Sequence, residues 1–275
     1  MGGIRLISSN WRWSKVITFI ILTFTISSIF YIIMYSTGST RDVGAVWMWS
    51  PAIGAILTQW LFHGNIRNIV LGLGNKKYLL FGLMVPFFYA SVIYGIAWIT
   101  GLAGFHKPTL AYLLFLPIGL IAACLAALGE EIGWRGLLVP ELSKLTTFSK
   151  TVLLTWAIWS IWHYPAIIFA DYHSQAPRWF DLLTLTVTIL GLSCFTTWLR
   201  LKSGSIWAVV IWHGAHNLFI QEAFIHMSTD TPLSKYVIDD FGIGLVLVSL
   251  MLGFVCWKRR FEVSQYFLTN IRKAG

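Results

Sequence analysis

Two adjacent carboxylates and an arginine close a long apolar stretch of this chain. Glu130 and Glu131 end the run that begins near residue 110, and Arg135 follows four residues after Glu131. An ionisable side chain in a membrane-spanning helix costs about 2.5–3.5 kcal/mol even on insertion scales, so such groups mark functional sites by default. Neighbouring helical residues point about 100° apart, whereas residues four apart share a face. We therefore expect Glu131 to pair with Arg135 and Glu130 to point elsewhere.

Two further apolar runs carry imidazole groups. In the first, Trp159 lies one helical turn before His163. In the second, His213 and Asn217 are four residues apart and share a face, while His216 is displaced from His213 by about 60° and could substitute for it. A lone histidine in a span can simply hydrogen-bond a backbone carbonyl, so each motif alone predicts little.

One carboxylate, two imidazoles and an amide from three spans could together hydrolyse a peptide bond. A glutamate in a cavity that excludes water can act as general base toward a water molecule. Histidine can ligate a metal ion, and histidine or asparagine can donate hydrogen bonds to a developing oxyanion. At about 1.5 Å per residue, Glu130 lies about 7 Å, His213 about 12 Å and His163 about 16 Å from the expected ends of their spans. We expect these groups to meet in one half of the membrane, with His163 fitting least well.

The composition identifies a polytopic membrane protein. Of 275 residues, 57% are hydrophobic and 11% are charged, with a mean hydropathy of +0.71, whereas soluble domains have about 25% charged residues. The net charge of +9 does not predict nucleic-acid binding, because Lys and Arg lie in short gaps between apolar runs. The chain shows no internal repeat and no stretch suited to a soluble domain, so we expect residues 1–275 to form a single membrane domain.

Apolar runs of spanning length predict an all-α bundle of about eight transmembrane helices around an intramembrane cavity. The first run follows a basic segment and lacks a cleavage site, so it is expected to be a retained signal anchor. The expected spans are residues 16–35, 45–62, 78–99, 110–130, 151–170, 182–199, 205–223 and 241–257.

Lys and Arg are distributed unevenly between the two sides that these spans define. Sixteen lie on the side of both termini and four on the other side. Because cytoplasmic loops carry the positive excess, we expect a multi-pass protein of the cell membrane with both termini in the cytoplasm. This orientation would place Glu130 near the cytoplasmic end of the fourth span.

Six tryptophans lie near the ends of expected spans. Tryptophan is enriched at both membrane–water interfaces, where its ring meets the lipid headgroups. We therefore expect the following residues to be interfacial anchors: Trp11, Trp13, Trp47, Trp49, Trp179 and Trp257.

The three motifs together resemble the CPBP (ABI) family of intramembrane proteases, which includes the type II CaaX prenyl proteases and bacteriocin-processing or immunity-associated proteins. The resemblance covers about residues 115–220, which would be the catalytic core. One departure is Trp159, where the family commonly has Phe. The motifs, in chain order on apolar runs, are Glu130-Glu131-x-x-x-Arg135, Trp159-x-x-x-His163 and His213-x-x-x-Asn217.

The resemblance implies a helical membrane core whose conical cavity opens to the cytoplasm and admits a peptide. It also implies roles for the motif residues. Glu130 would be the general base, Glu131 and Arg135 a structural pair supported by Trp159, and the rest of the site would be His163, His213 and Asn217.

Two mechanisms remain open for such a site. In a metalloprotease, His163 and His213 would hold Zn²⁺ beside Glu130, and the metal would lower the pKa of its bound water toward about 7. In a glutamate protease, Glu130 and His163 would activate water directly while His213 and Asn217 form the oxyanion hole. The absence of an H-E-x-x-H sequence removes only the commonest zinc-protease pattern.

Two other functional classes fit the same residues. A catalytically silent scaffold or bacteriocin self-immunity protein would use the fold to bind a peptide or a membrane partner. A proton-coupled transporter would relay protons through Glu130 and His213, although transporters usually show paired repeats, which this sequence lacks. A protease would instead act on a peptide or protein substrate at the lipid bilayer, and no nucleic acid is expected as a partner.

Overall fold

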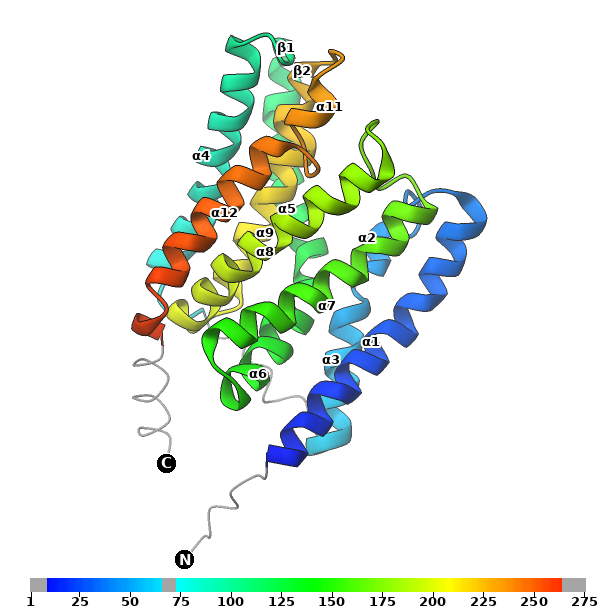
Figure 1. Cartoon of the computed structure of the whole chain (residues 1–275), viewed down its shortest axis with the longest axis vertical. Helices are drawn as coiled ribbons and strands as arrows, with labels where there is room; N and C mark the ends of the chain where they lie inside the picture. The colour runs from blue at the N-terminus through cyan, green and yellow to red at the C-terminus, as the bar shows by residue number, and fades with distance from the viewer. Residues whose placement is uncertain (1–8, 66–72, 264–275) are drawn as a thin grey trace, which may run out of the picture.

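The computed structural model describes residues 9–65 and 73–263, which form a bundle of helices (Figure 1). Two two-residue strands pair antiparallel near one end of the bundle. Among the described residues, the elements are α1 (Ser9–Thr37), α2 (Gly44–Trp47), α3 (Ser50–His63), α4 (Lys77–Ile99), β1 (Gly104–Phe105), α5 (Leu110–Glu131), η1 (Ile132–Leu138), α6 (Val139–Leu145), α7 (Phe148–Phe169), α8 (Arg178–Ser203), α9 (Trp207–His216), η2 (Asn217–Ala223), α10 (Phe224–His226), β2 (Ser228–Thr229), α11 (Ser234–Val237) and α12 (Ile243–Lys258).

Helical segments lie at all the positions expected for membrane spans. α12 is apolar but shorter than the long spans, α3 is also short, and α9 continues through η2 into α10. The expectation of an all-α, polytopic membrane protein is thus confirmed. Among the described residues, five helices are long and apolar enough to cross a membrane: Asn10–Thr37, Lys77–Ile99, Leu110–Leu145, Phe148–Phe169 and Arg178–Ser203.

The helix that contains the fourth expected span is longer than the sequence suggested. α5 continues into η1 and α6, so that one helical segment runs from Leu110 to Leu145. Glu130 therefore lies about 20 Å before the end of this segment, near its middle. The helix does not stop at Arg135, but its length does not mark where the membrane ends, so the position of Glu130 near the cytoplasmic end of its span stays a prediction. His163 lies a comparable distance from the start of α7 at Phe148, so it is no outlier in depth.

Glycines let the site-bearing helices approach their neighbours closely. A Cβ atom on Gly129 would lie 2.7 Å from the carbonyl oxygen of Met48, and one on Gly214 would lie 2.8 Å from Cα of Cys124. Real Cβ atoms do not come this close to backbone, so side chains at these positions would push the helices apart. Gly129 thus holds α5 against the start of α3, and Gly214 holds α9 against α5.

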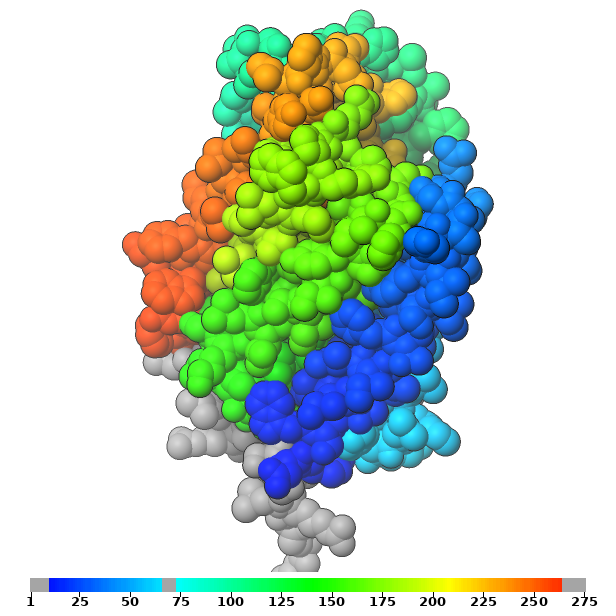
Figure 2. Space-filling view, turned by 45° about the vertical axis from the view of Figure 1, so that its right-hand side comes forward, coloured from blue at the N-terminus to red at the C-terminus, as the bar shows by residue number. Residues whose placement is uncertain are grey.

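The interior of the bundle is rich in aromatic side chains. Trp134, Trp162 and Trp212 are completely enclosed. α12 packs along α8 on one side of the molecule, and α1 packs with α3 on the other (Figure 1). Figure 2 shows α1 and α7 as neighbouring diagonal bands on one face. The site-bearing helices α5, α7 and α9 lie between these outer pairs.

The beginning of α1 and the end of α12 lie toward the same end of the molecule (Figure 1). This arrangement agrees with an even number of membrane crossings. The side of the membrane that this end faces stays a prediction from the distribution of Lys and Arg.

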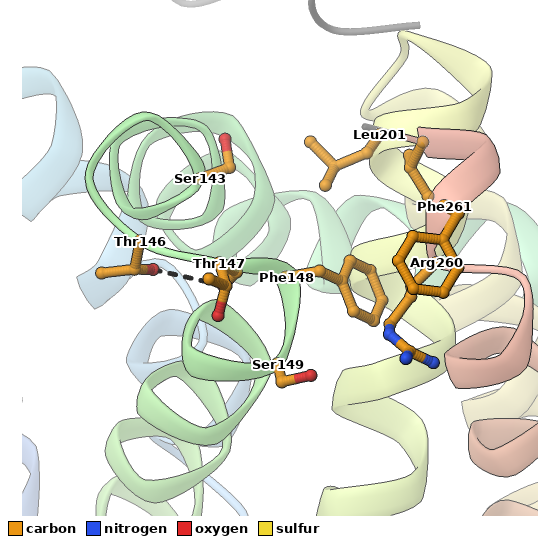
Figure 3. Close-up of a pocket in the computed structure, with 9 residues that line it drawn as sticks. Ser143, Thr146, Thr147, Phe148, Ser149, Leu201, Arg260 and Phe261 are labelled. Carbon is orange, nitrogen blue, oxygen red and sulfur yellow. Dashed lines mark hydrogen bonds between the residues drawn. The ribbon is translucent and has the colours of Figure 1, made fainter. Parts of the chain in front are cut away.

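A cavity of about 510 Å³ lies among the connection between α6 and α7, the end of α8 and the residues after α12 (Figure 3). The rings of Phe148 and Phe261 point toward each other across it, beside Arg260. Among the described residues its lining contains no carboxylate and no imidazole, and the residues predicted for catalysis lie elsewhere. The lining residues are Ser143, Thr146, Thr147, Phe148, Ser149, Leu201, Arg260, Phe261 and Val263.

Candidate active site

The four predicted catalytic residues line one cavity of about 170 Å³ in the middle of the bundle. Glu130 comes from the end of α5, His163 from α7, His213 from α9 and Asn217 from the start of η2. The structure thus brings together, from three helical segments, every residue that the sequence singled out for chemistry. The rest of the lining is Thr40, Gly44, Trp47, Met48, Tyr172 and Gln221.

Glu130 is held by two indole groups. The Nε1 atoms of Trp134 and Trp159 both donate to its Oε2 atom, at 3.1 and 2.8 Å. The residue is only 2% exposed, yet its Oε1 atom has no hydrogen bond to any described residue. One oxygen is therefore fixed by the protein and the other is free to bind a water molecule. Trp159 was expected only as an aromatic support, whereas it also supplies a donor that Phe would lack.

Glu131 and Arg135 form the predicted ion pair. Nη1 of Arg135 lies 2.9 Å from Oε1 of Glu131, and both side chains are fully buried. Nη2 of Arg135 donates to Oγ1 of Thr196 at 2.7 Å, and the guanidinium carbon lies 4.1 Å from the ring centre of Trp159. This buried pair therefore connects α5 and η1 to both α7 and α8.

Glu131 has a second partner that the sequence analysis did not foresee. Nδ1 of His213 lies 2.8 Å from Oε1 of Glu131. A carboxylate paired with arginine accepts hydrogen bonds, so His213 must donate from Nδ1. In the neutral ring this leaves Nε2 as the unprotonated nitrogen. Glu131 therefore sets the tautomer of a predicted catalytic histidine as well as pairing with Arg135.

His163 is fixed in the same way by a different acceptor. Its Nδ1 atom lies 2.8 Å from the backbone oxygen of Trp159. A carbonyl oxygen can only accept, so Nδ1 carries the hydrogen and Nε2 has a lone pair in the neutral ring. Neither His163 nor His213 has an Nε2 hydrogen bond to the described residues. Both imidazoles therefore keep one nitrogen available for water, substrate or a metal ion.

Two of the three motif helices, α5 and α9, widen into π-helical turns at the site. η1 begins immediately after Glu131, and η2 begins at Asn217. Such π-helical turns are uncommon in proteins and often occur at functional sites. The side chain of Asn217 has no hydrogen bond within the described part of the chain, so its amide is free to face the cavity that it lines.

His216 does not substitute for His213. Its Nδ1 atom lies 2.5 Å from the hydroxyl of Tyr89, and its Nε2 atom lies 3.2 Å from Oδ1 of Asp240. Asp240 also accepts from the hydroxyl of Tyr172 at 2.8 Å and from Nε2 of Gln221 at 2.7 Å. The suggestion that His216 could replace His213 is therefore wrong, because the ring is used in a separate network beside the cavity.

Three residues at or beside the cavity were missed from the sequence. Gln221 lies four residues after Asn217, as Asn217 lies four after His213. This regular spacing of polar residues on an apolar segment could have identified Gln221 as a site residue. Tyr172 and Asp240 lie in connections between helices, where sequence spacing gives no signal.

Trp47 was expected to be an interfacial anchor, and this prediction is wrong. Only 5% of Trp47 is exposed, and its ring stacks on that of Trp162 with centres 3.9 Å apart. Trp47 also lines the cavity beside Glu130. The short helix α2 packs inside the bundle. Trp47, at the end of α2, is therefore buried in the core although it lies only ten residues after the end of α1.

The connection between α1 and α2 is tied down beside the cavity. Asp171 accepts from Oγ of Ser39 at 2.6 Å and from both the backbone nitrogen and Oγ1 of Thr40 at 2.7 Å. Partial burial alone would raise the pKa of Asp171, but the hydrogen bonds from Ser39 and Thr40 outweigh it and lower this pKa below its usual value. Since Thr40 lines the cavity, Asp171 helps to fix one wall.

The cavity residues lack the ligand set that a zinc site requires, as far as the described part of the chain shows. Zinc in proteases is held by three protein ligands, usually nitrogen and carboxylate oxygen. No group of three or more His, Cys, Asp or Glu side chains in the described ranges is arranged to hold a metal ion. The residues do not fit a zinc centre in this arrangement, so no catalytic step is derived through a metal. His163 and His213 stay predicted metal ligands.

Comparison with known proteins supports the reading of these motifs. Residues 112–219 match the family model described as "Type II CAAX prenyl endopeptidase Rce1-like". The resemblance to the CPBP family is confirmed. The matched Rce1-like segment contains Glu130, His163, His213 and Asn217.

A curated relative agrees with the family model. The chain is 30% identical over 124 residues to a protein of Methanococcus maripaludis named "CAAX prenyl protease 2". The alignment covers 43% of this chain and 44% of the relative. The chain thus matches less than half the length of this relative.

Proposed function

We propose that this protein is an intramembrane endopeptidase that hydrolyses a peptide bond of a membrane-associated substrate. The observation that carries the proposal is that Glu130, His163 and His213 line one cavity, while Oε1 of Glu130 and the Nε2 atoms of both histidines have no hydrogen bond among the described residues. Each of these atoms is left free because the other polar atom of its group is bound by the protein. Such an arrangement is suited to binding and activating a water molecule.

In the proposed reaction Glu130 acts as the general base. Its Oε1 atom takes a proton from water while the water oxygen attacks the carbonyl carbon of the substrate. His163, with a lone pair on Nε2, accepts a second hydrogen bond from the same water and orients it. The carbon–nitrogen bond then breaks, and Glu130 returns the proton to the leaving amine, which yields an acid and an amine.

Asn217 and His213 are proposed to bind the carbonyl oxygen of the substrate. The Asn217 amide can donate at any pH, because its NH₂ group is neutral. His213 can donate from Nε2 only when it is the imidazolium, because its Nδ1 hydrogen is already given to Glu131. This difference makes Asn217 the donor that does not depend on protonation.

The proposed substrate class follows from the relatives. The family model and the Methanococcus protein are both named for CAAX prenyl proteases. We propose peptides with a prenylated cysteine near the C-terminus as the first substrates to examine, with the unprenylated peptides as comparison. Cleavage of only the prenylated peptides would support the narrow assignment, and cleavage of both would support a broader endopeptidase.

The proposal is tested by substitution of the base. Glu130→Gln should abolish cleavage in detergent or in liposomes while the protein still inserts and folds. Glu222→Gln is a matched control, since Glu222 is exposed and lies outside the cavity. Unchanged cleavage by Glu130→Gln would contradict the proposal. Full biological activity of a cleavage-deficient variant would favour the scaffold or self-immunity alternative.

A further inference from the structure

The network around Asp240 fixes the orientation of groups in the proposed active site. Asp240 lies between α11 and α12 and is 4% exposed. It is approached by Nε2 of His216 at 3.2 Å, the hydroxyl of Tyr172 at 2.8 Å and Nε2 of Gln221 at 2.7 Å. Two side chains from the α9–η2 segment and one from the connection between α7 and α8 therefore converge on one buried carboxylate.

Asp240 is the ionised member of a pair of neighbouring acids. Burial alone would raise its pKa, but the hydrogen bonds from His216, Tyr172 and Gln221 outweigh this effect and lower the pKa below its usual value. For Asp239, burial and the adjacent charge of Asp240 raise the pKa above its usual value. An ionised Asp240 can only accept hydrogen bonds, so each of its partners must present a hydrogen to it.

This requirement decides the direction of the Gln221 amide. The NH₂ group must face Asp240, because the amide oxygen would be repelled by the carboxylate. The amide oxygen Oε1 is then left without a hydrogen bond among the described residues. The same argument puts the hydrogen of His216 on Nε2, so that Nδ1 accepts from the hydroxyl of Tyr89.

Gln221 lines the cavity that contains Glu130. It follows Asn217 by one helical turn and His213 by two. Two other polar side chains that line this cavity already donate their hydrogens within the protein. The Tyr172 hydroxyl donates to Asp240, and the Thr40 hydroxyl donates to Asp171. A peptide in the cavity brings backbone N–H groups with it, and burying such a donor without an acceptor costs about 1–3 kcal/mol.

We propose that Oε1 of Gln221 accepts a hydrogen bond from a backbone N–H of the substrate peptide, and that Asp240 is the positioning residue that turns this oxygen toward the cavity. The inference rests on the proposed endopeptidase function and deepens it. It assigns a substrate-binding residue one turn beyond the three motifs and a positioning residue in a connection between helices.

Peptide binding to a catalytically inactive protein tests this directly. In the Glu130→Gln background, a fluorescent peptide of the kind cleaved by the wild type should bind, and adding Gln221→Met should weaken binding about tenfold. Methionine has a similar length but neither accepts at that position nor donates to Asp240. Adding Glu222→Gln instead should leave binding unchanged. Thermal unfolding of each variant reports whether the fold is kept.

N-methylated peptides separate a direct contact from a structural role. Methylation of the one backbone nitrogen that contacts Gln221 should weaken binding to the Glu130→Gln protein, yet cause no further loss once Gln221→Met is present. Methylation at other positions should weaken binding equally in both proteins. A purely structural role of Gln221 would give additive losses at every position and would overturn the inference.

The role of Asp240 has its own variant. Asp240→Asn can accept from Gln221 or donate to it, so the amide is no longer forced into one orientation. In the active enzyme, KM should rise severalfold with a smaller change in kcat, whereas the exposed Asp230→Asn should match the wild type. A change in kcat alone would overturn the positioning role.

If Glu130→Gln binds no peptide and the wild type cleaves none, the proposed function fails as well. If cleavage and binding are normal but Gln221→Met binds equally well, only this inference fails.

Discussion

His213 and Arg135 donate to the same oxygen of Glu131, with Nδ1 of His213 at 2.8 Å and Nη1 of Arg135 at 2.9 Å. One buried carboxylate oxygen therefore balances a guanidinium and fixes the tautomer of an imidazole. This arrangement makes Glu131 different from its neighbour Glu130, whose hydrogen bonds among the described residues come from two neutral indole groups. The two adjacent acids should consequently respond differently to substitution.

Glu131→Gln should damage both folding and chemistry, whereas Glu130→Gln should damage chemistry alone. Removing one partner of a buried ion pair costs about 3–5 kcal/mol, because Arg135 is left without a counterion. His213 would also lose the acceptor that orients it. Thermal unfolding in detergent, measured alongside peptide cleavage, distinguishes the two variants. Equal losses of stability in both would refute this division of roles.

Trp159→Phe should slow peptide cleavage by about tenfold or more while keeping the protein folded. Phe preserves an aromatic face beside Arg135 but removes the N–H that donates to Glu130, a bond worth about 1.5–3 kcal/mol when the acceptor is charged. Trp156→Phe is a matched control, since Trp156 lies on the same helix and donates to the backbone of Thr186, away from the cavity. Similar cleavage rates in both variants would show that the indole N–H of Trp159 is dispensable.

Chelation should leave peptide cleavage largely intact. The described residues bring no three metal ligands together, so we expect a water molecule to be activated by Glu130 and His163. The measurement is metal analysis of the purified wild type and of His213→Ala, combined with cleavage in the presence and absence of a chelator. Stoichiometric zinc in the wild type that is lost in His213→Ala, with activity abolished by the chelator, would instead establish the metalloprotease mechanism.

Asp171→Asn should lower the thermal unfolding temperature at neutral pH by at most a few degrees. The pKa of Asp171 is lower in the folded protein than the value of about 3.9 in an unfolded chain. Its contribution to stability is therefore present above pH 4 and lost as the pH falls through the lowered folded value. The difference between wild type and Asp171→Asn should shrink over that acidic range. A difference that stays constant with pH would mean that the charge is not responsible.

Much of the fold could be predicted from periodicity and charge. The i, i+4 spacing of Glu131 and Arg135 predicted the ion pair that they form, and the apolar runs predicted the positions of the helices. The full length of the helix that carries Glu130 was not predicted, because nothing in the sequence after Glu131 marks a helix that continues as a π-helix. Trp47 was misplaced because a turn back into the core depends on packing against Trp162.

The site was predictable where its residues share helical faces and not where they depend on loops. His163, His213 and Asn217 followed from spacing and from a family resemblance. The role of Asp240 depends on how the segment before α12 folds back over the bundle, which no local pattern encodes. The direction of the Gln221 amide follows only once that carboxylate is in place.

The two π-helices have a consequence for changes in chain length. A π-helical turn holds more residues than an α-helical one, so deleting a single residue from η1 or η2 would let the helix return to ordinary winding. The helix beyond the turn would keep nearly the same direction, because fewer residues wound at about 100° each cover a similar total rotation, whereas residues inside the turn would move one place closer in sequence. Arg135 would then follow Glu131 by three residues instead of four, or Gln221 would follow Asn217 by three, and the contacts that depend on these spacings would change. In these two segments the site geometry therefore depends on the number of residues as well as on their identity. We expect a deletion there to impair the protein even at positions where most substitutions are tolerated.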